Sequence, residues 1–284
     1  MRRIFLFAGI LLSLPVLTQE APPAIHWRLD WEAQTLELTI GLAPPAGRLT
    51  PDAPHRTLQD IQTLLPLSLR QTLSTLRISS RITGEDFFRS NPDRLLSLLA
   101  LPETKRPDLI TYSQDLSRIT ARYTFSVPRE ILPHLLLHHD PDPLPERIGW
   151  VPADTFSGLV IDAKGTFPVY GKQGETAALT PSLFPRLYST TGELVLSERM
   201  IPPQVLTRWG AVAFTTSYRE EPHLERIGAH PLRIRAEAVF GQGRTDLVIP
   251  EEAVRMLLAH PENQRILTEG RILVICENVV QEGP

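Results

Sequence analysis

The stretch REILPHLLLHHDPDPLPERIGWVPADT, residues 129–155, divides the chain into two halves. Its first part places apolar residues at helical spacing, which predicts a short helix. Its second part has four prolines between positions 141 and 152 and no apolar periodicity, which is typical of a connector. We therefore predict an N-terminal domain over residues 22–138, a proline-rich linker over 139–153 and a C-terminal domain over 154–278. Residues 279–284 are expected to be a tail.

The composition predicts a packed protein with many chain breaks. The chain has 284 residues, of which 42% are apolar and 21% charged, so it can form a sizeable core. Its 27 prolines indicate short loops and interrupted helices. The net charge of -3 argues against a nucleic-acid partner, which a basic surface would attract. Because Cys276 is the only cysteine, the fold has no internal disulfide.

The N-terminus carries the pattern of a secretory signal peptide over residues 1–21. Arg2 and Arg3 precede the uncharged run Ile4–Leu17, which is too short for a helix that spans a bilayer, since such a helix needs about 20 residues. We therefore expect export to the periplasm or beyond, with no transmembrane span after cleavage. An uncleaved anchor or a buried first segment is the alternative.

The N-terminal half predicts an α+β domain. The alternating stretches IHWRLDW (25–31) and TLELTIGL (35–42) predict a hairpin. A leucine-rich helix follows with Thr57 as its N-cap, and Pro66 should kink it or split it in two. Another helix starts at Asn91, and a second hairpin is predicted around Asp115.

The C-terminal half predicts a strand-rich α+β domain with two helices near its end and a final core strand. FSGLVIDAKG (156–165) predicts a buried strand, and TTGE (190–193) predicts the turn of a hairpin. HPLRIRAEAVFG (230–241) alternates throughout and predicts one strand. Helices are expected from Pro250 and over 261–267, followed by the last strand RILVIC (271–276).

Several blocks of the C-terminal half resemble a family of exported, spirochaete-type bacterial envelope proteins of unassigned function. The resemblance covers about residues 150 to 276, and its most characteristic block is GLVIDAKG (158–165), preceded by Ser157 where the family has threonine. The N-terminal half is loosely similar to domains of flagellar-assembly proteins and of small outer-membrane lipoproteins. In those proteins the first helix is rich in alanine, whereas this chain has leucines and Pro66. The resemblance implies a role in the envelope and no particular reaction.

HLLLHHDPDP (134–143) is the sequence's candidate metal site. His134 and His138 are four residues apart and would share one face of a helix, and Asp140 could add a carboxylate. The simpler interpretation is that the histidines end a helix and the Asp-Pro pairs form turns. We favour the simpler interpretation, because no His-Glu-x-x-His motif and no second cluster accompany these residues. No cofactor is implied.

Two residues stand out as candidates for ligand binding, and none stands out for catalysis. Asp162 ends a strand, where binding residues often lie, although an aspartate there more often caps a turn. Arg186 follows a proline in LFPRLYST. The four tryptophans could line a groove for a ligand or glycan, but they are more often core anchors. The arginines at 226, 233, 235 and 244 could form a patch for an anionic partner, although a solvated face is the simpler interpretation.

The sequence thus favours an exported, non-enzymatic envelope protein that takes part in envelope or flagellar-type assembly through protein partners. One alternative is a periplasmic metal-dependent hydrolase built on residues 134–142 or on Asp162. Another is a module that binds a small ligand or glycan. An enzyme requires a deep pocket with convergent polar groups, whereas an assembly factor should have an exposed apolar patch or an unpaired sheet edge.

Overall fold

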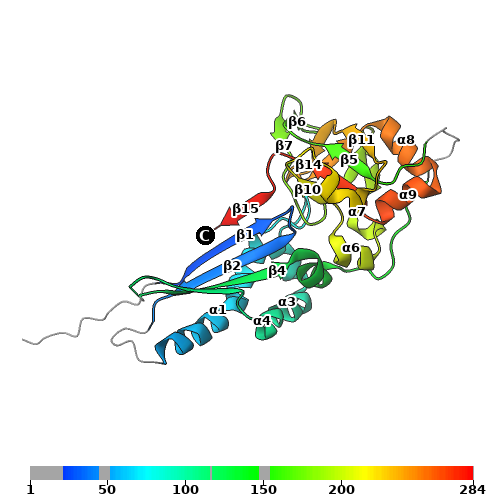
Figure 1. Cartoon of the computed structure of the whole chain (residues 1–284). Coiled ribbons are helices and arrows are strands. Elements are labelled where there is room, and N and C mark those ends of the chain that lie inside the picture. The colour runs from blue at the N-terminus through cyan, green and yellow to red at the C-terminus, as the bar shows by residue number, and fades with distance from the viewer. Residues whose placement is uncertain (1–21, 45–51, 116, 147–153, 284) are drawn as a thin grey trace, which may run out of the picture.

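The computed structural model describes residues 22–44, 52–115, 117–146 and 154–283, which form two mixed α+β domains. Figure 1 shows the N-terminal domain with its long sheet and helix α1, and the C-terminal domain with shorter strands and helices around them. The predicted fold class is therefore confirmed. Within these ranges no helix has the length and apolar character needed to cross a bilayer. The predicted signal peptide and the second half of the linker lie outside the described residues.

A five-stranded antiparallel sheet forms the N-terminal domain, in the order β15-β1-β2-β4-β3. Both predicted hairpins are present. They are β1 (Ala24–Asp30) with β2 (Thr35–Leu42), and β3 (Leu109–Tyr112) with β4 (Ile119–Ser126). Alternate residues of β1, β2 and β4 are buried, so one face of the sheet holds the core and the other is polar.

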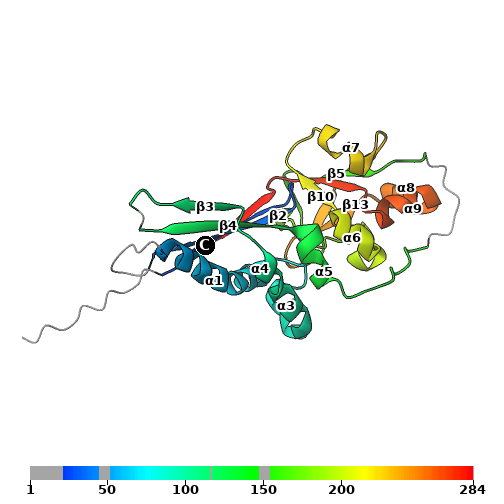
Figure 2. The ribbon, with the colours of Figure 1, turned by 60° about the horizontal axis from the view of Figure 1, so that its bottom comes forward.

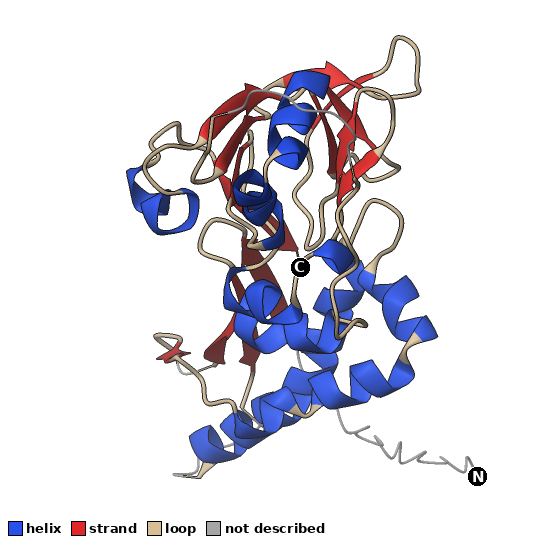
Figure 3. Ribbon diagram, turned by 90° about the vertical axis from the view of Figure 1, so that its right-hand side faces the viewer, coloured by secondary structure: helices blue, strands red, loops and turns tan. Residues whose placement is uncertain are grey.

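Helices cover the apolar face of this sheet (Figure 3). Helix α1 (Ala53–Thr75) packs on β2 and β4, and α2 (Gly84–Ser90), α3 (Pro92–Leu99) and α4 (Leu101–Thr104) follow it. Of the two outcomes predicted at Pro66, a kink or a split, the split was wrong, because α1 continues through this residue. The predicted N-cap was also wrong. Thr57 lies inside the helix, where its hydroxyl donates to the carbonyl of Ala53.

The segment after β4 ends the N-terminal domain. A π-helical turn (Val127–Ile131) leads into the short helix α5 (Leu132–Leu135), as the apolar spacing of that stretch predicted. Residues 137–146 then run on without helix or strand, in agreement with a connector.

The C-terminal domain has a parallel sheet at its centre. Its order is β10 (Ala213–Thr215), β14 (Ile272–Ile275), β5 (Leu159–Asp162) and β11 (Leu232–Arg235). All four residues of β14 and the first three of β5 are buried, which matches their continuous apolar sequences.

A second four-stranded sheet packs beside the parallel one. It contains β12 (Ala238–Phe240), β13 (Asp246–Ile249), β8 (Leu187–Ser189) and β9 (Leu194–Leu196), in that order, and the hairpin β8–β9 turns where TTGE predicted it. Strands β6 (Thr166–Pro168) and β7 (Thr176–Ala178) form a separate pair. The helices of this domain are α6 (Pro203–Trp209), α7 (Leu224–Ile227), α8 (Glu251–Ala259) and α9 (Pro261–Thr268).

The single strand predicted over residues 230–241 is divided between the two sheets. The amide of Ala236 donates to the carbonyl of Asp162 in the parallel sheet, whereas the next amide, that of Glu237, donates to Val248 in the second sheet. The alternation of buried and exposed residues continues across this point, so the sequence pattern gives no sign of the change of sheet.

The expected tail is instead a strand of the N-terminal sheet. β15 (Val280–Gly283) pairs antiparallel with β1 over Trp27–Asp30, and the amide of Trp31 donates to the carbonyl of Val279 at 2.8 Å. The end of the chain therefore returns to the first domain after the last core strand of the second (Figure 1). The prediction that residues 279–284 form a free tail was therefore wrong, because residues 280–283 pair with a strand some 250 residues earlier in the sequence.

Candidate functional site

Asp162 lies at the carboxyl end of β5, beside the ends of β14 and β11. Ligands often bind at this edge of a parallel sheet. One carboxylate oxygen, Oδ1, accepts a hydrogen bond from the amide of Lys164 at 3.1 Å and from the hydroxyl of Tyr218 at 3.4 Å. The first bond closes the turn after β5, so Asp162 has the turn-capping role that aspartates usually have there.

The side chains around Asp162 bond to one another. The ammonium of Lys164 donates to the carbonyl of Thr216 at 3.0 Å and lies 5.4 Å from the centre of the Tyr218 ring. Loss of solvation, together with the nearby Asp162 carboxylate, raises the pKa of Tyr218. Tyr218 therefore stays neutral at ordinary pH and donates to Asp162. These contacts fix the loops at the carboxyl edge of the parallel sheet.

Arg186, the other candidate, lies where the two domains meet. Its guanidinium donates to Glu198 at 3.3 Å, and both side chains are largely buried. Its backbone amide donates to the carboxylate of Asp246 at 3.2 Å. Arg186 is therefore held in an internal ion pair, and its guanidinium is already engaged by a carboxylate of the same chain.

The two histidines of the candidate metal site bond to different parts of the molecule. Nδ1 of His134 lies 2.7 Å from the hydroxyl of Ser97 on α3, whereas Nε2 of His138 lies 2.9 Å from the carbonyl of Ile201 in the C-terminal domain. Asp140 is exposed, and the nearby Asp142 pairs with Arg199 at 2.7 Å. Within the described ranges no group of three or more His, Cys, Asp or Glu side chains could hold a metal ion. His138 and Asp142 instead attach the connector to the C-terminal domain, whereas His134 belongs to the N-terminal domain.

The tryptophans that the structure describes are packing residues. Trp31 is buried and makes an edge-to-face contact with Phe214, and Trp27 is buried under the backbone of Gly283. Trp209 stacks against the guanidinium of Arg208 and donates its indole N–H to the carbonyl of Glu269. The fourth tryptophan, Trp150, lies outside the described residues. Trp31 also lines a small cavity between the two domains.

Three of the four arginines that could have formed a patch are held by separate partners within the chain, and one of them, Arg226, is a core residue that no sequence pattern indicated. Arg226 is 6% exposed and donates to the carbonyls of Gly270, Trp209 and Gly210 at 2.7, 2.6 and 2.9 Å. Burial lowers the pKa of its guanidinium to about 9. Arg233 and Arg244 instead pair with Glu220 and Glu175. Arg226 therefore joins the end of α6 to the turn after α9.

A buried carboxylate at the junction of the two domains was also missed. Asp246 is fully buried and accepts hydrogen bonds from the hydroxyl of Ser80 at 2.5 Å and from the amide of Arg186. Burial raises the pKa of this carboxyl group. Ser80 belongs to the loop after α1, whose carbonyls also accept from the amides of Phe184 and Gly243. No local signal distinguishes Asp246 from an ordinary turn aspartate in GQGRTD.

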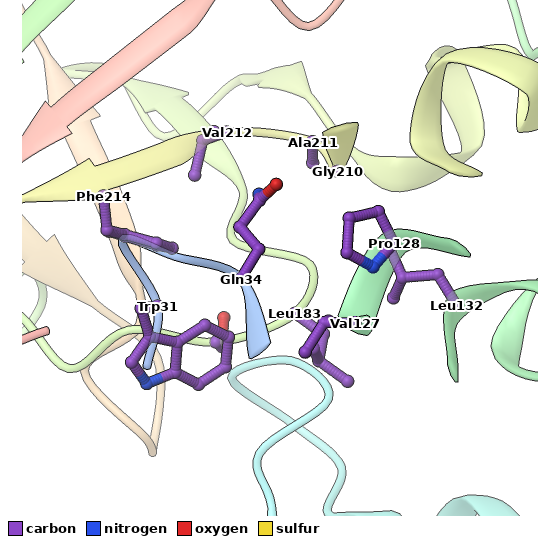
Figure 4. Close-up of a pocket in the computed structure, with 11 residues that line it drawn as sticks. Trp31, Gln34, Val127, Pro128, Leu132, Leu183, Gly210, Ala211, Val212 and Phe214 are labelled. Carbon is purple, nitrogen blue, oxygen red and sulfur yellow. The ribbon is translucent and has the colours of Figure 1, made fainter. Parts of the chain in front are cut away.

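A small cavity lies between the two domains (Figure 4). It encloses about 20 Å³, which is room for about one water molecule and too little for a metabolite. Apolar side chains from both domains form most of its wall, and Gln34 crosses it to donate to the carbonyl of Trp209 at 2.8 Å. The cavity is a packing defect of the interface and does not have the size of a substrate pocket.

Strand β3 is the most exposed regular element of the described chain. It is an edge of the N-terminal sheet, and all four of its residues, Leu-Ile-Thr-Tyr, are exposed. Leu109, Ile110 and Tyr112 are 44%, 36% and 51% exposed, values high for large apolar side chains. In Figure 2 the β3–β4 hairpin extends away from the C-terminal domain, with β3 on its outer side. This edge of the sheet is therefore unpaired among the described residues.

Comparison with known protein families gives two matches. Residues 22–134 match Treponema pallidum Tp0624, N-terminal domain, and residues 158–278 match Treponema pallidum Tp0624, second domain. No curated protein matches the chain. The matches confirm the expected likeness to a spirochaete-type family, and neither of them supports the likeness to flagellar-assembly proteins. The chain therefore carries, in the same order, two regions that are similar to the N-terminal and second domains of Tp0624.

Proposed function

We propose that the chain is an exported, non-enzymatic protein of the cell envelope that works through protein contacts. In this proposal its working surface is the edge of β3, which takes up an extended segment of a partner as an additional strand. The observation that carries the proposal is an edge strand with apolar side chains and no charge. Natural edge strands usually carry a lysine, a proline or an inward-pointing charge that discourages such pairing.

The backbone of β3 supports strand addition at two residues. The amide of Ser113 donates to the carbonyl of Arg118, so Ser113, Thr111 and Leu109 are the residues bonded to β4. In an antiparallel ladder the residues between them direct their N–H and C=O groups to the other side. Ile110 and Tyr112 therefore point both groups outward, where no strand of the described chain lies.

The exposed side chains add an apolar contribution to that pairing. Ile110 and Tyr112 lie on the face of the sheet that the helices cover elsewhere, and Leu109 lies on the polar face. Each side chain would lose about half of its exposed area to an added strand, which is worth about 1 kcal/mol each. Strand addition with side-chain contacts of this kind is a common mode of peptide recognition.

Export is supported by the N-terminal sequence, where Arg2 and Arg3 precede the apolar run Ile4–Leu17. The envelope role is in keeping with the family resemblance. The two alternative functions lack a comparable observation, because His134 and His138 bond to different partners and the tryptophans that could line a groove are packed.

The test combines a photo-crosslinker with a proline substitution. A benzophenone amino acid replaces Tyr112, and cross-links are collected in cells that express the exported chain. The matched control carries the benzophenone at Leu96 on α3, which is 67% exposed. Ile110→Pro removes an outward N–H but no bond to β4, since proline is tolerated where the N–H of an edge strand faces solvent.

We expect the benzophenone at position 112 to form cross-links that Ile110→Pro abolishes. Any cross-links from the control position 96 should be unchanged by Ile110→Pro. Circular dichroism and thermal unfolding of Ile110→Pro show whether the hairpin is retained. Equal cross-linking with and without the proline, in a variant that keeps its fold, would contradict strand addition at β3.

A further inference from the structure

We propose that the strand that adds to β3 is the β3 of a second copy of this chain, antiparallel, with a twofold axis through Thr111. The inference rests on the proposed function, because it concerns the same edge. It names the occupant of that edge, and it predicts a continuous ten-stranded sheet formed from two N-terminal domains.

The outward backbone groups of β3 are arranged symmetrically about Thr111. Ile110 and Tyr112 present them, one residue to either side. Asp108, the next residue toward the N-terminus that could present an outward N–H, does not do so. Its amide donates to the carbonyl of Arg122 at 2.8 Å and therefore points toward β4. An axis at Thr111 pairs Ile110 with Tyr112 of the second copy and Tyr112 with Ile110 of the second copy. Each pair forms two hydrogen bonds, which gives four in all. A register shifted by one residue would turn these groups away from each other.

The side chains of β3 suit pairing with a copy of themselves in this register. Ile110 would oppose Tyr112 of the second copy, and pairs of aromatic and β-branched residues are among the favourable cross-strand contacts. Thr111 would oppose Thr111 across the axis, where two hydroxyls can bond to each other. Leu109 would oppose Ser113, so the polar face acquires no buried charge.

Charge also permits this pairing. Residues 109–113 contain no charged side chain, so identical strands meet without like charges in opposition. The hairpin extends away from the C-terminal domain in Figure 2, which leaves space beside β3 for a second molecule.

The contact is short, so the association should be weak. Four residues on each side bury far less than the area of about 800 Å² per partner that stable dimers use. We therefore expect a dimer that forms in a concentration-dependent way and is most populated where many copies are close together, as on an envelope surface.

The test is a charge exchange at Thr111, measured by sedimentation equilibrium of the purified mature chain from about 10 µM to about 1 mM. Thr111→Lys and Thr111→Glu each place like charges opposite one another on the axis, and each should weaken self-association up to about fivefold. An equimolar mixture of the two should associate at least as well as the original chain. Thr63→Lys, an exposed threonine on α1, is the matched control and should not change self-association.

Recovery in the mixture would establish that β3 faces its own copy at Thr111. A chain that stays monomeric at the highest concentration overturns the self-pairing. If position 112 still cross-links to other proteins, and Ile110→Pro abolishes these cross-links, then strand addition at β3 stands without self-pairing. If neither Thr111→Lys nor Thr111→Glu weakens self-association, the dimer contact lies elsewhere on the molecule, and the inference is also overturned. Loss of both self-association and dependent cross-links rejects the two proposals together.

Discussion

Removal of residues 279–284 should destabilise the N-terminal domain, although these residues follow the whole of the C-terminal domain. The truncation deletes β15 from the edge of the sheet and uncovers Trp27. We expect about 5 kcal/mol from five lost backbone hydrogen bonds, about 3 kcal/mol from Val279 and Val280 and about 2 kcal/mol from the uncovered indole. The ordering of five residues costs about 7 kcal/mol, which leaves a net loss of about 3 kcal/mol.

Thermal unfolding followed by tryptophan fluorescence and circular dichroism measures this loss, which should lower Tm by about 5 to 10 °C in a chain of this size. Gly283→Ala tests the same packing by a point change, because its methyl group would overlap the indole of Trp27. Glu282→Ala is the matched control on β15. It removes only an exposed ion pair with Arg28, at 3.6 Å, and should change the stability by less than about 0.5 kcal/mol. A truncated chain with unchanged Tm would refute the contribution of β15.

Three further substitutions test the core and the domain junction. Gly84→Ala should cost about 1 to 3 kcal/mol in urea unfolding, because the new methyl group would overlap the carbonyl of Leu73; an unchanged midpoint would contradict this. Asp246→Asn should remove a pH dependence. Burial raises the pKa of this carboxyl, so the folded chain binds more protons than the unfolded one, and its stability contribution is largest below about pH 4 and is lost as the pH rises through the folded pKa. A variant with the original slope of unfolding free energy against pH would show that another group is responsible. Arg226→Lys should cost about 2 kcal/mol or more, since a single ammonium nitrogen cannot occupy the three positions from which Nε, Nη1 and Nη2 bond the carbonyls; wild-type stability in the variant would count against that role.

The elements with a strong local signal could be predicted from the sequence. The hairpin β1–β2 alternates apolar and polar residues, β14 is an unbroken apolar run, and so are the first three residues of β5. Each of these patterns depends only on residues within the element and on burial of one face or both. The same reasoning left open a split of the helix at Pro66, which does not occur, because the contacts of α1 with β2 and β4 hold the helix together despite the missing N–H.

The elements that depend on distant contacts could not be predicted. The sequence of β15, Val-Gln-Glu-Gly, has no apolar alternation, and its pairing is determined by the free edge of β1 and by the indole of Trp27. Asp246 and Arg226 resemble surface residues in the sequence, and only the approach of Ser80 and of three carbonyls makes their burial tolerable. The strand β3 was predicted, but its place at an edge follows from the order of the strands, which no local pattern encodes.

The two edges of the N-terminal sheet differ in a way that supports β3 as the working surface. At one edge, the chain uses its own last strand to cover β1, and that strand carries Glu282, an exposed charge that discourages further pairing. At the other edge, β3 has neither a covering strand nor a charge of its own among the described residues. An unprotected edge carries a risk of aggregation, and a protein that protects one edge of a sheet has the means to protect the other. Substitution of Thr111 by lysine would supply the missing protection, and we expect it to leave folding intact while it removes the self-pairing that we propose for β3.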